Sequence, residues 1–321
     1  MESGERNLPP KVIVVAGPTA SGKTRLGIEL AKLYNGEIVS ADSMQIYRGM
    51  DIGTAKAPEA ERGGIPHHMI DVAEPTENWS VSRYVDEATR ACDTLISEGK
   101  LPVIVGGTGL YIDSLLSGRD FADTQEDKEL RSALSEEYDR IGGEKMLEKL
   151  RSFDPERAEK LAATDKRRIL RAIEIFSLTG KTITQHDRET KALPPRYDAA
   201  YIVLNYKDRA DLYERIESRV DRMIEEGLFD EVQRLLDGGL SPNSTAMQAI
   251  GYKEAAEALR GGISREEAIE KIKISSRRYA KRQITWFGRR EDALRILFDR
   301  EPDFEAARQL SSDFSAAKGI S

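Results

Sequence analysis

The sequence predicts an α/β fold, in which a parallel sheet flanked by helices is interrupted by an all-helical insertion. Three observations support it. Apolar runs typical of buried strands alternate with helical patterns over residues 11–118. Residues 119–195 are helical and highly charged, with no convincing strand, and end at Pro194-Pro195. The apolar run 201–205 then restores a strand. Residues 196–300 would therefore complete the core.

The individual elements follow from their patterns. We expect strands at 12–16, 37–41, 102–105 and 201–205, and helices at 24–34, 81–98, 209–226, 228–237 and 264–287. Strands that alternate with helices in this way imply right-handed crossovers between parallel neighbours. Residues 301–321 are expected to form a weakly ordered tail.

The most informative stretch is the octapeptide GPTASGKT, which fits the pattern G-x-x-x-x-G-K-[ST] between the first strand and the first helix. It predicts a P-loop core of the NTPase-like type, a loop that in many proteins binds nucleotides such as ATP. Backbone N–H groups and the helix dipole would hold a phosphate chain, Lys23 would add a cation and Thr24 would hold magnesium. The predicted diphosphate site consists of Gly17, Pro18, Thr19, Ala20, Ser21, Gly22, Lys23 and Thr24.

The composition excludes several classes of protein. No apolar run approaches the ~18 residues that span a bilayer, and no signal-peptide stretch is evident at the N-terminus, so we expect a cytoplasmic protein without membrane contact. Cys92 is the only cysteine and reads as a core thiol, and the three histidines form no Cys/His cluster for zinc. Magnesium held by oxygen ligands is the expected metal. No exposed apolar heptad or patch is evident, which favours a monomer.

Two basic segments stand out from a net charge of −7. Residues 271–290 contain eight Lys or Arg and no acid, interleaved with aromatic side chains. The second segment is Lys166-Arg167-Arg168 on a predicted helix. Such runs fit either a local nucleic-acid surface or an ordinary solvated helix face, and the residues alone leave both interpretations open.

Asp42 directly follows the strand at 37–41. Ligands of parallel sheets gather at the carboxyl ends of the strands, so Asp42 should share an edge with the P-loop. There it could bind magnesium, act as a general base, or only cap a turn. The strand at 102–105 ends in Gly106-Gly107 rather than in the Asp with which nucleotide hydrolases anchor magnesium, which argues against that class.

Arg219 lies in the apolar stripe that Ile216, Val220 and Met223 form on the helix 209–226. A guanidinium on a buried face is costly unless an anion accompanies it. A bound phosphate and a structural carboxylate are the two candidate partners.

The chain resembles the bacterial tRNA dimethylallyltransferases (isopentenyl-diphosphate:tRNA transferases) over about residues 11–290. The motifs that carry the resemblance are GPTASGKT (17–24), SADSMQIYRGMDIGTAK (40–56), IPHHMID (65–71), VGGTGLY (105–111), AMQAIGYKE (246–254) and YAKRQITWF (279–287). Because the sequence has no Cys/His cluster, we expect no counterpart of the C-terminal zinc finger found in some eukaryotic relatives.

The resemblance implies transfer of a dimethylallyl group from dimethylallyl diphosphate to the exocyclic N6 amine of the adenosine 3′ of the anticodon, in tRNAs that read codons beginning with U. Asp42 would take up the proton of the amine. Thr19 would hydrogen-bond the leaving oxygen, and Arg219 would balance the charge that develops on the diphosphate.

The resemblance further implies that the tRNA anticodon stem-loop is the partner and that a specific set of residues lies at the RNA surface. These are Asp42, Ser43, Met44, Gln45, Thr108, Arg131, Lys166, Arg167, Arg168, Ile169, Leu170, Gln248, Gly251, Tyr252, Lys281, Arg282 and Gln283. His67 and His68 have no derivable role beyond turn or core packing. Two competing interpretations are a small-molecule kinase or NTPase, and a non-catalytic RNA-binding module.

Overall fold

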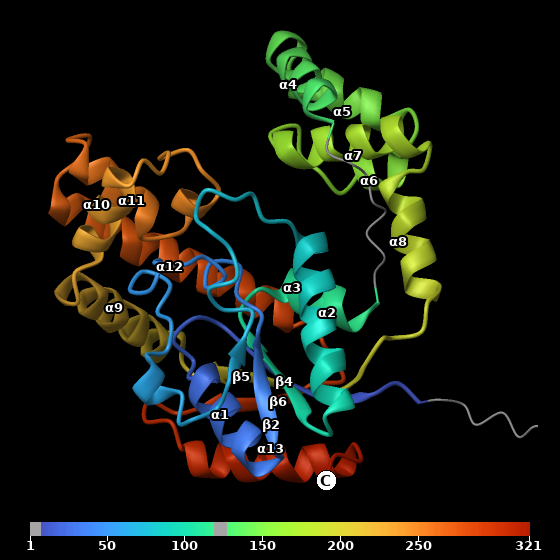
Figure 1. Cartoon of the computed structure of the whole chain (residues 1–321). Helices are drawn as coiled ribbons and strands as arrows, with labels where there is room; N and C mark the ends of the chain where they lie inside the picture. Colours follow the sequence, from blue (N-terminus) through green and yellow to red (C-terminus); the bar gives the residue numbers. More distant parts are fainter. Residues whose placement is uncertain (1–7, 119–126) are drawn as a thin grey trace, which may run out of the picture. The chain divides into compact units, whose positions relative to one another are not determined.

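The structure, a computed structural model, describes residues 8–118 and 127–321 (Figure 1). It consists of two compact units: Met1–Leu116 together with Arg196–Ser321, and Ser117–Pro195. The sequence placed the insertion at 119–195, of which residues 119–126 lie outside the described part.

The first unit is built on a six-stranded sheet in the order β3-β2-β4-β1-β5-β6, with every neighbouring pair parallel. The strands are β1 (Lys11–Ala16), β2 (Gly36–Ser40), β3 (His67–His68), β4 (Leu101–Gly106), β5 (Asp198–Tyr206) and β6 (Leu294–Phe298). The four predicted strands are present. The two edge strands β3 and β6 were not predicted, and His67 and His68 form the first of them.

Alternate residues of the strands bury one face of the sheet. Ile13 and Val15 of β1 share a core with Ile202 and Leu204 of β5, and with the apolar residues of helices α1 (Lys23–Leu33) and α13 (Phe304–Ala317). Helices α2 (Val81–Ser97) and α3 (Gly109–Leu116) cover the opposite side (Figure 1). β1 thus runs through the centre of the sheet, with β4 on one side and β5 on the other.

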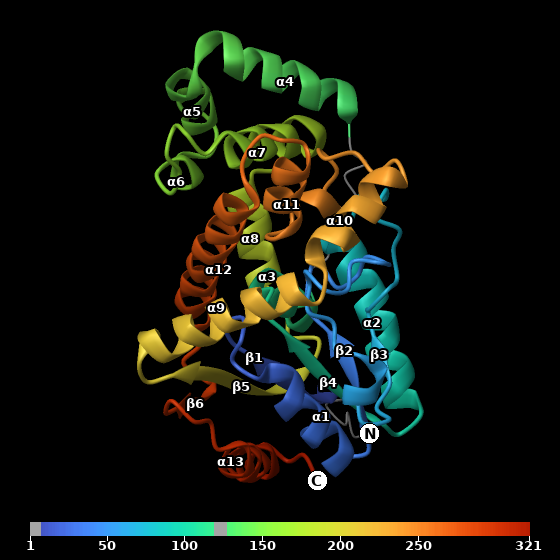
Figure 2. The ribbon, with the colours of Figure 1, turned by 90° about the vertical axis from the view of Figure 1, so that its left-hand side faces the viewer.

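The prediction of a weakly ordered tail at 301–321 is wrong. Residues Phe304–Ala317 form helix α13, which lies beside α1 below the sheet (Figure 2). Phe304 is 7% exposed, and its ring packs against Phe298 with centroids 5.2 Å apart. The helix is anchored further by Tyr34, whose hydroxyl contacts Ser312. The C-terminal segment is therefore part of the core that supports the P-loop.

A second core joins the loop after β2 to four C-terminal helices. These are α9 (Arg209–Glu225), α10 (Leu228–Asp237), α11 (Tyr252–Leu259) and α12 (Arg265–Phe287). Ile46, Tyr47 and Met50 of the loop are fully buried against apolar residues of these helices. Short 3-10 turns occur at Glu59–Glu61 and Ala246–Gln248. The loop that follows Asp42 is thereby part of the folded interior.

In its described residues the second unit contains only helices. They are α4 (Lys128–Ile141), α5 (Gly143–Arg151), α6 (Pro155–Ala158), α7 (Lys166–Thr179) and α8 (Ile183–Ala192). Ile169, Leu170 and Ile173 of α7 pack with Met146 and Leu150 of α5 in a small core of their own. Across the described parts of both units, no helix combines the length and apolarity that spanning a bilayer requires.

Candidate active site

The P-loop joins the central strand β1 to α1. Gly17 has φ +147, and a Cβ there would lie 2.4 Å from the Leu204 carbonyl oxygen, so only glycine fits. Gly22 has φ +84, and a Cβ there would lie 2.3 Å from the Phe304 ring. Gly22 is also the N-cap of α1 and carries no side-chain cap, so that the first backbone N–H groups of the helix are left for a ligand. The loop therefore has the geometry of an anion site.

Lys23 is held over the loop by a 2.6 Å hydrogen bond from its Nζ to the Pro18 carbonyl oxygen. Burial and, to a smaller extent, nearby Arg219 lower the pKa of Lys23 to about 7, although Asp42 acts in the opposite direction. Without a bound anion, the ammonium form of Lys23 is thus unusually costly.

This lowered pKa predicts proton uptake when a diphosphate binds. At about pH 8.5 Lys23 of the free protein is mostly neutral, and the anion restores its positive charge. Affinity for an alkyl diphosphate should therefore fall as pH rises above about 7, by at most about tenfold per pH unit for one proton. Calorimetry in buffers of different ionisation enthalpy measures the uptake directly. Lys23→Arg, which keeps the charge at every pH used, should abolish it; equal uptake by both proteins would contradict the assignment.

Two side chains fix the tip of the P-loop at Thr19. Arg219 of α9 donates from Nη1 to the Thr19 hydroxyl at 3.0 Å. Gln283 of α12 accepts a bond from the Thr19 backbone N–H at 2.9 Å and donates to the Gly107 carbonyl oxygen, also at 2.9 Å. Thr19 is therefore oriented by one helix from each side.

Arg219 has no ion-pair partner among the described carboxylates, so the structural carboxylate considered as its partner is absent from this part of the chain. Burial lowers the pKa of Arg219, and Asp42 acts in the opposite direction. Arg219 faces the cavity and its guanidinium is hydrogen-bonded to the Thr19 hydroxyl, so it favours binding of an anion there. The bound phosphate remains a prediction.

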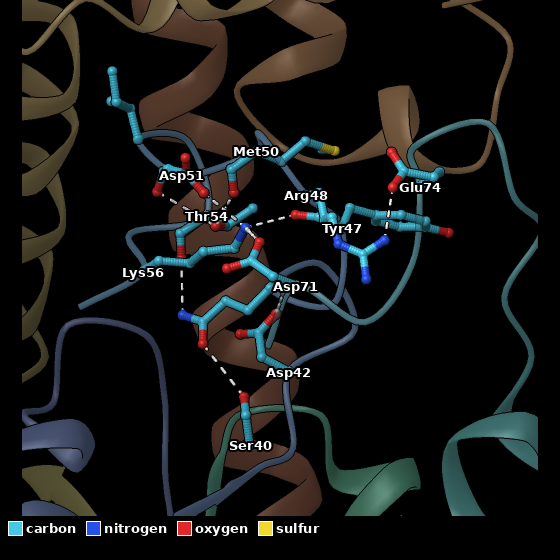
Figure 3. Close-up of polar contacts among 12 residues, drawn as sticks. Ser40, Asp42, Tyr47, Arg48, Met50, Asp51, Thr54, Lys56, Asp71 and Glu74 are labelled. Atoms are coloured by element: carbon cyan, nitrogen blue, oxygen red, sulfur yellow. Dashed lines mark hydrogen bonds and ion pairs between the residues drawn. The ribbon is translucent and has the colours of Figure 1, made fainter. Parts of the chain in front are cut away.

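Asp42 follows β2, which ends at Ser40 (Figure 3). It lines the same cavity as Lys23 and Thr24 of the P-loop, as expected. Its Oδ1 accepts hydrogen bonds from the backbone N–H groups of Met44 at 2.9 Å and Gln45 at 3.4 Å, so one oxygen does cap a turn. The carboxylate nevertheless lines the cavity described next. Turn formation and chemistry at Asp42 are thus compatible.

The P-loop and Asp42 face one cavity of about 370 Å³ within the first unit. Polar residues of its lining include Thr19, Lys23, Thr24, Asp42, Gln45, Arg219, Arg282 and Gln283, and apolar ones include Val220, Met223 and Ile250. A second, charged hollow of about 810 Å³ shares Lys23, Thr24 and Arg219 with it. The phosphate site is therefore reached from two sides.

The donors around the P-loop suit magnesium. Thr24 and Asp42 line the same cavity and offer only oxygen atoms, which Mg²⁺ prefers when it also binds substrate phosphates and water. Within residues 8–118 and 127–321, no group of three or more His, Cys, Asp or Glu could hold a metal by itself. Any ion here would rely on the phosphates for its remaining ligands.

The predicted RNA-surface residues of the first unit do not all lie in the same kind of place. Ser43, Met44, Gln45, Gln248, Arg282 and Gln283 line the cavity. Thr108 accepts a bond from the Ser43 backbone N–H at 3.1 Å and so supports the Asp42 turn. Lys281 is exposed on α12, and Gly251, with φ +97, precedes α11.

Tyr252 and Gln283 correct the expectation of an RNA surface at those positions. Tyr252 is completely buried, with its hydroxyl on the carboxylate of Glu231 at 2.5 Å. Gln283 is 5% exposed, and its side-chain amide makes the hydrogen bonds to Thr19 and Gly107 given above. Both act inside the protein, because each finds a polar partner there.

In the second unit, the basic residues are largely paired. Arg131 contacts Glu174 at 3.1 Å, Lys166 contacts Asp139 at 2.6 Å and Arg168 contacts Asp165 at 3.5 Å. Arg167 is exposed. Ile169 and Leu170 are core residues of this unit, which corrects their predicted place at an RNA surface.

The basic segment of α12 combines both interpretations that its sequence allowed. Toward its N-terminal end Lys271, Lys273 and Arg277 pair with acids of α9 and α11. Arg278, Lys281 and Arg282 are exposed without an ion-pair partner among the described acids. A free positive surface thus remains only toward the C-terminal half of the helix.

A glycine loop at the centre of a parallel sheet, with a buried lysine and an acid facing one cavity, is the arrangement of a P-loop protein whose cavity suits a phosphate-bearing ligand. The comparisons specify the family. A sequence model described as IPP transferase matches residues 45–291, and the chain belongs to that family.

The relatives agree with this assignment. The chain is similar to the tRNA dimethylallyltransferase of Thermoanaerobacter sp. (strain X514), with 50% identity over 86% of this chain and 88% of the relative. It is 47% identical to the enzyme of the same name from Caldanaerobacter subterraneus, over 96% and 98% of the two chains.

Solved structures show the same fold. A full-length tRNA isopentenylpyrophosphate transferase from Bacillus halodurans matches with a TM-score of 0.71 and 40% identity over 96% of each chain. A eukaryotic dimethylallyltransferase, described as acting on tRNA, matches with a TM-score of 0.81 and 30% identity over 97% of this chain and 81% of its own.

Proposed function

We propose that this protein is a tRNA dimethylallyltransferase. It transfers the dimethylallyl group of dimethylallyl diphosphate to the N6 amine of the adenosine 3′ of the anticodon, in tRNAs that read codons beginning with U. Family membership and the names of the relatives support the reaction class. The observation that carries the proposal in the structure is that the P-loop and Asp42 face one cavity, where a diphosphate and an amine can meet.

The residues then divide the reaction between them. Backbone N–H groups of the P-loop and Lys23 bind the diphosphate, while Thr19 and Arg219 meet the oxygen that bridges to the allylic carbon. The N6 atom attacks that carbon, the carbon–oxygen bond breaks, and its electron pair leaves with the diphosphate. The amine proton passes to the carboxylate of Asp42. A magnesium ion, held by Thr24, would supply further neutralisation of the phosphate charge.

The cavity also suits both organic groups. The apolar residues Val220, Met223 and Ile250 supply a dry wall for a five-carbon chain. An adenosine must leave its stack to enter, at a cost of a few kcal/mol that is smallest in a single-stranded loop. Exposed Arg278, Lys281 and Arg282 on α12 provide positive charge for the RNA backbone.

Labelled dimethylallyl diphosphate, magnesium and an unmodified tRNA test the proposal. Label should enter the tRNA when adenosine stands 3′ of the anticodon, and should not enter a matched tRNA with a purine that lacks the exocyclic amine. ATP hydrolysis or phosphate transfer without prenyl transfer would instead identify a kinase or NTPase. The end of β4 argues against that alternative, since Gly106 is followed by Gly107 rather than by the acid with which nucleotide hydrolases anchor magnesium.

A further inference from the structure

Lys56 is a buried lysine in the first unit that the proposed reaction does not use. Its side chain is 4% exposed. The ammonium group donates to the Tyr47 carbonyl oxygen at 2.5 Å, to Asp51 at 2.7 Å and to Asp71 at 2.5 Å (Figure 3). All three N–H donors of the ammonium are therefore satisfied, each by a different part of the surrounding loops.

The contacts of Lys56 lead to Asp42 in a short series of hydrogen bonds. Asp71, which accepts from Lys56, donates its backbone N–H to the Gln45 carbonyl oxygen at 3.1 Å. Gln45 in turn donates its backbone N–H to Asp42 Oδ1 at 3.4 Å. Lys56 thus fixes Asp71, which is bonded to Gln45, and Gln45 in turn is bonded to the Asp42 carboxylate.

The side chain of Gln45 fixes the same turn from its other end. Its Oε1 accepts from Ser40 Oγ at 3.3 Å, and its Nε2 donates to the carbonyl oxygens of Thr54 at 3.1 Å and Ala55 at 3.4 Å. Residues 54 and 55 directly precede Lys56. Asp42 therefore lies between two residues, Ser40 and Gln45, that are tied to each other and to the lysine's own loop.

We propose that Lys56 is a positioning residue, whose buried ammonium fixes Gln45 and thereby the direction of the Asp42 carboxylate. The inference rests on the proposed function, in which Asp42 receives the amine proton. Misplacement of a reacting group by about 1 Å can cost on the order of 10²-fold in rate. The Lys56 ammonium, with three hydrogen-bond partners, limits such a displacement of Asp42 because it fixes the loops around Gln45.

A second buried charge makes the test practicable. Glu231 of α10, 2% exposed, accepts backbone N–H bonds from Asp51 and Ile52 through Oε2, at 3.0 and 2.9 Å, and from Gly53 through Oε1 at 3.2 Å. Glu231 holds the backbone of Asp51, whereas Lys56 contacts its carboxylate, so this anchor does not require the lysine. Asp51 and Asp71 are also 58% and 41% exposed, so water can solvate them after loss of the lysine. Lys56→Met should therefore fold.

The variant Lys56→Met has a matched control in Arg48→Met. Arg48 comes from the same loop and also bridges to the segment after residue 71, through Glu74 at 2.6 Å, but that pair is 52% and 55% exposed. We expect Lys56→Met to lower kcat about 10- to 100-fold and to leave the KM for dimethylallyl diphosphate within about twofold, because the P-loop contacts are intact. Arg48→Met should retain kcat within about twofold.

Two readouts distinguish positioning from a general structural role. In an Asp42→Asn background, Lys56→Met should cause no further loss of activity, because it acts through Asp42; a full further loss would overturn the proposal. Hydrogen exchange of the Met44 and Gln45 amides should become faster in Lys56→Met but not in Arg48→Met. Unchanged exchange would overturn the proposal whatever the activity, so this outcome is separate from any failure of prenyl transfer by the parent enzyme.

Discussion

Asp42→Asn is expected to lower the rate of prenyl transfer by about 10²- to 10⁴-fold, the range that general-base catalysis supplies. Asparagine has the same shape and keeps an Oδ1 that accepts from the Met44 and Gln45 N–H groups, so the turn should survive. Only the ability to take a proton is lost. Single-turnover measurements with saturating tRNA report the chemical step directly.

The binding controls decide what the loss means. Affinity for tRNA and for dimethylallyl diphosphate should stay within about threefold, since neither depends on a proton at Asp42. Asp86→Asn, an exposed acid on α2, serves as the matched variant and should be fully active. If Asp42→Asn retained more than about a tenth of the rate, another group would have to be the base. Intact biological activity of that variant would favour the non-catalytic RNA-binding module.

Arg219→Met should lower kcat about 10²- to 10³-fold, equivalent to about 2.7–4 kcal/mol of transition-state stabilisation. The reason is that the guanidinium lies on the Thr19 hydroxyl, at the place where negative charge would grow on the leaving diphosphate. The same substitution should leave the melting temperature unchanged or raise it. It removes a desolvated cation from an apolar stripe in which Ile216 and Val220 are buried.

A double-mutant cycle tests whether Arg219 and Thr19 act together. If they stabilise the same oxygen, Thr19→Val combined with Arg219→Met should cost much less than the product of the two single losses. Arg209→Gln, an exposed residue at the start of the same helix, is the control for a general change of charge on α9. Strictly multiplicative losses would mean that the two residues serve separate purposes.

The fold was predictable where long apolar runs in the sequence indicate buried strands. β1, β4 and β5 are such runs, whereas β2 offers only the pair Ile38-Val39; all four lie in the buried middle of the sheet. β6 escaped because it is an edge strand whose side chains alternate between buried and exposed. α13 escaped because its buried face is made mostly of small residues, Ala307, Ser311 and Ser315, which carry little hydrophobic signal.

For the site, the sequence predicted which positions lie near the P-loop but not which partners their side chains bind. Asp42 could be placed because the carboxyl ends of parallel strands share one edge, and Arg219 because a charge stood in an apolar stripe. The inward orientation of the Tyr252 and Gln283 side chains could not be predicted, since their hydrogen-bond partners are distant in sequence. Glu231 shows the same limit: the N–H groups that it binds are separated from it by 178 to 180 positions. Lys56 depends on Asp71, which is 15 positions away and belongs to another loop.

The position of β1 has a consequence for the order in which the protein is made. β1 pairs with β4 on one side, but its other neighbour, β5, follows only after the helical unit Ser117–Pro195. During synthesis the backbone N–H and C=O groups on one edge of β1 therefore remain without their β5 partner while the helices of that unit are translated. The ring of Phe304, which closes beneath Gly22, arrives later still. Nascent chains that stop before β5 should consequently be prone to aggregation and to chaperone capture, and the anion site should appear only at the end of translation.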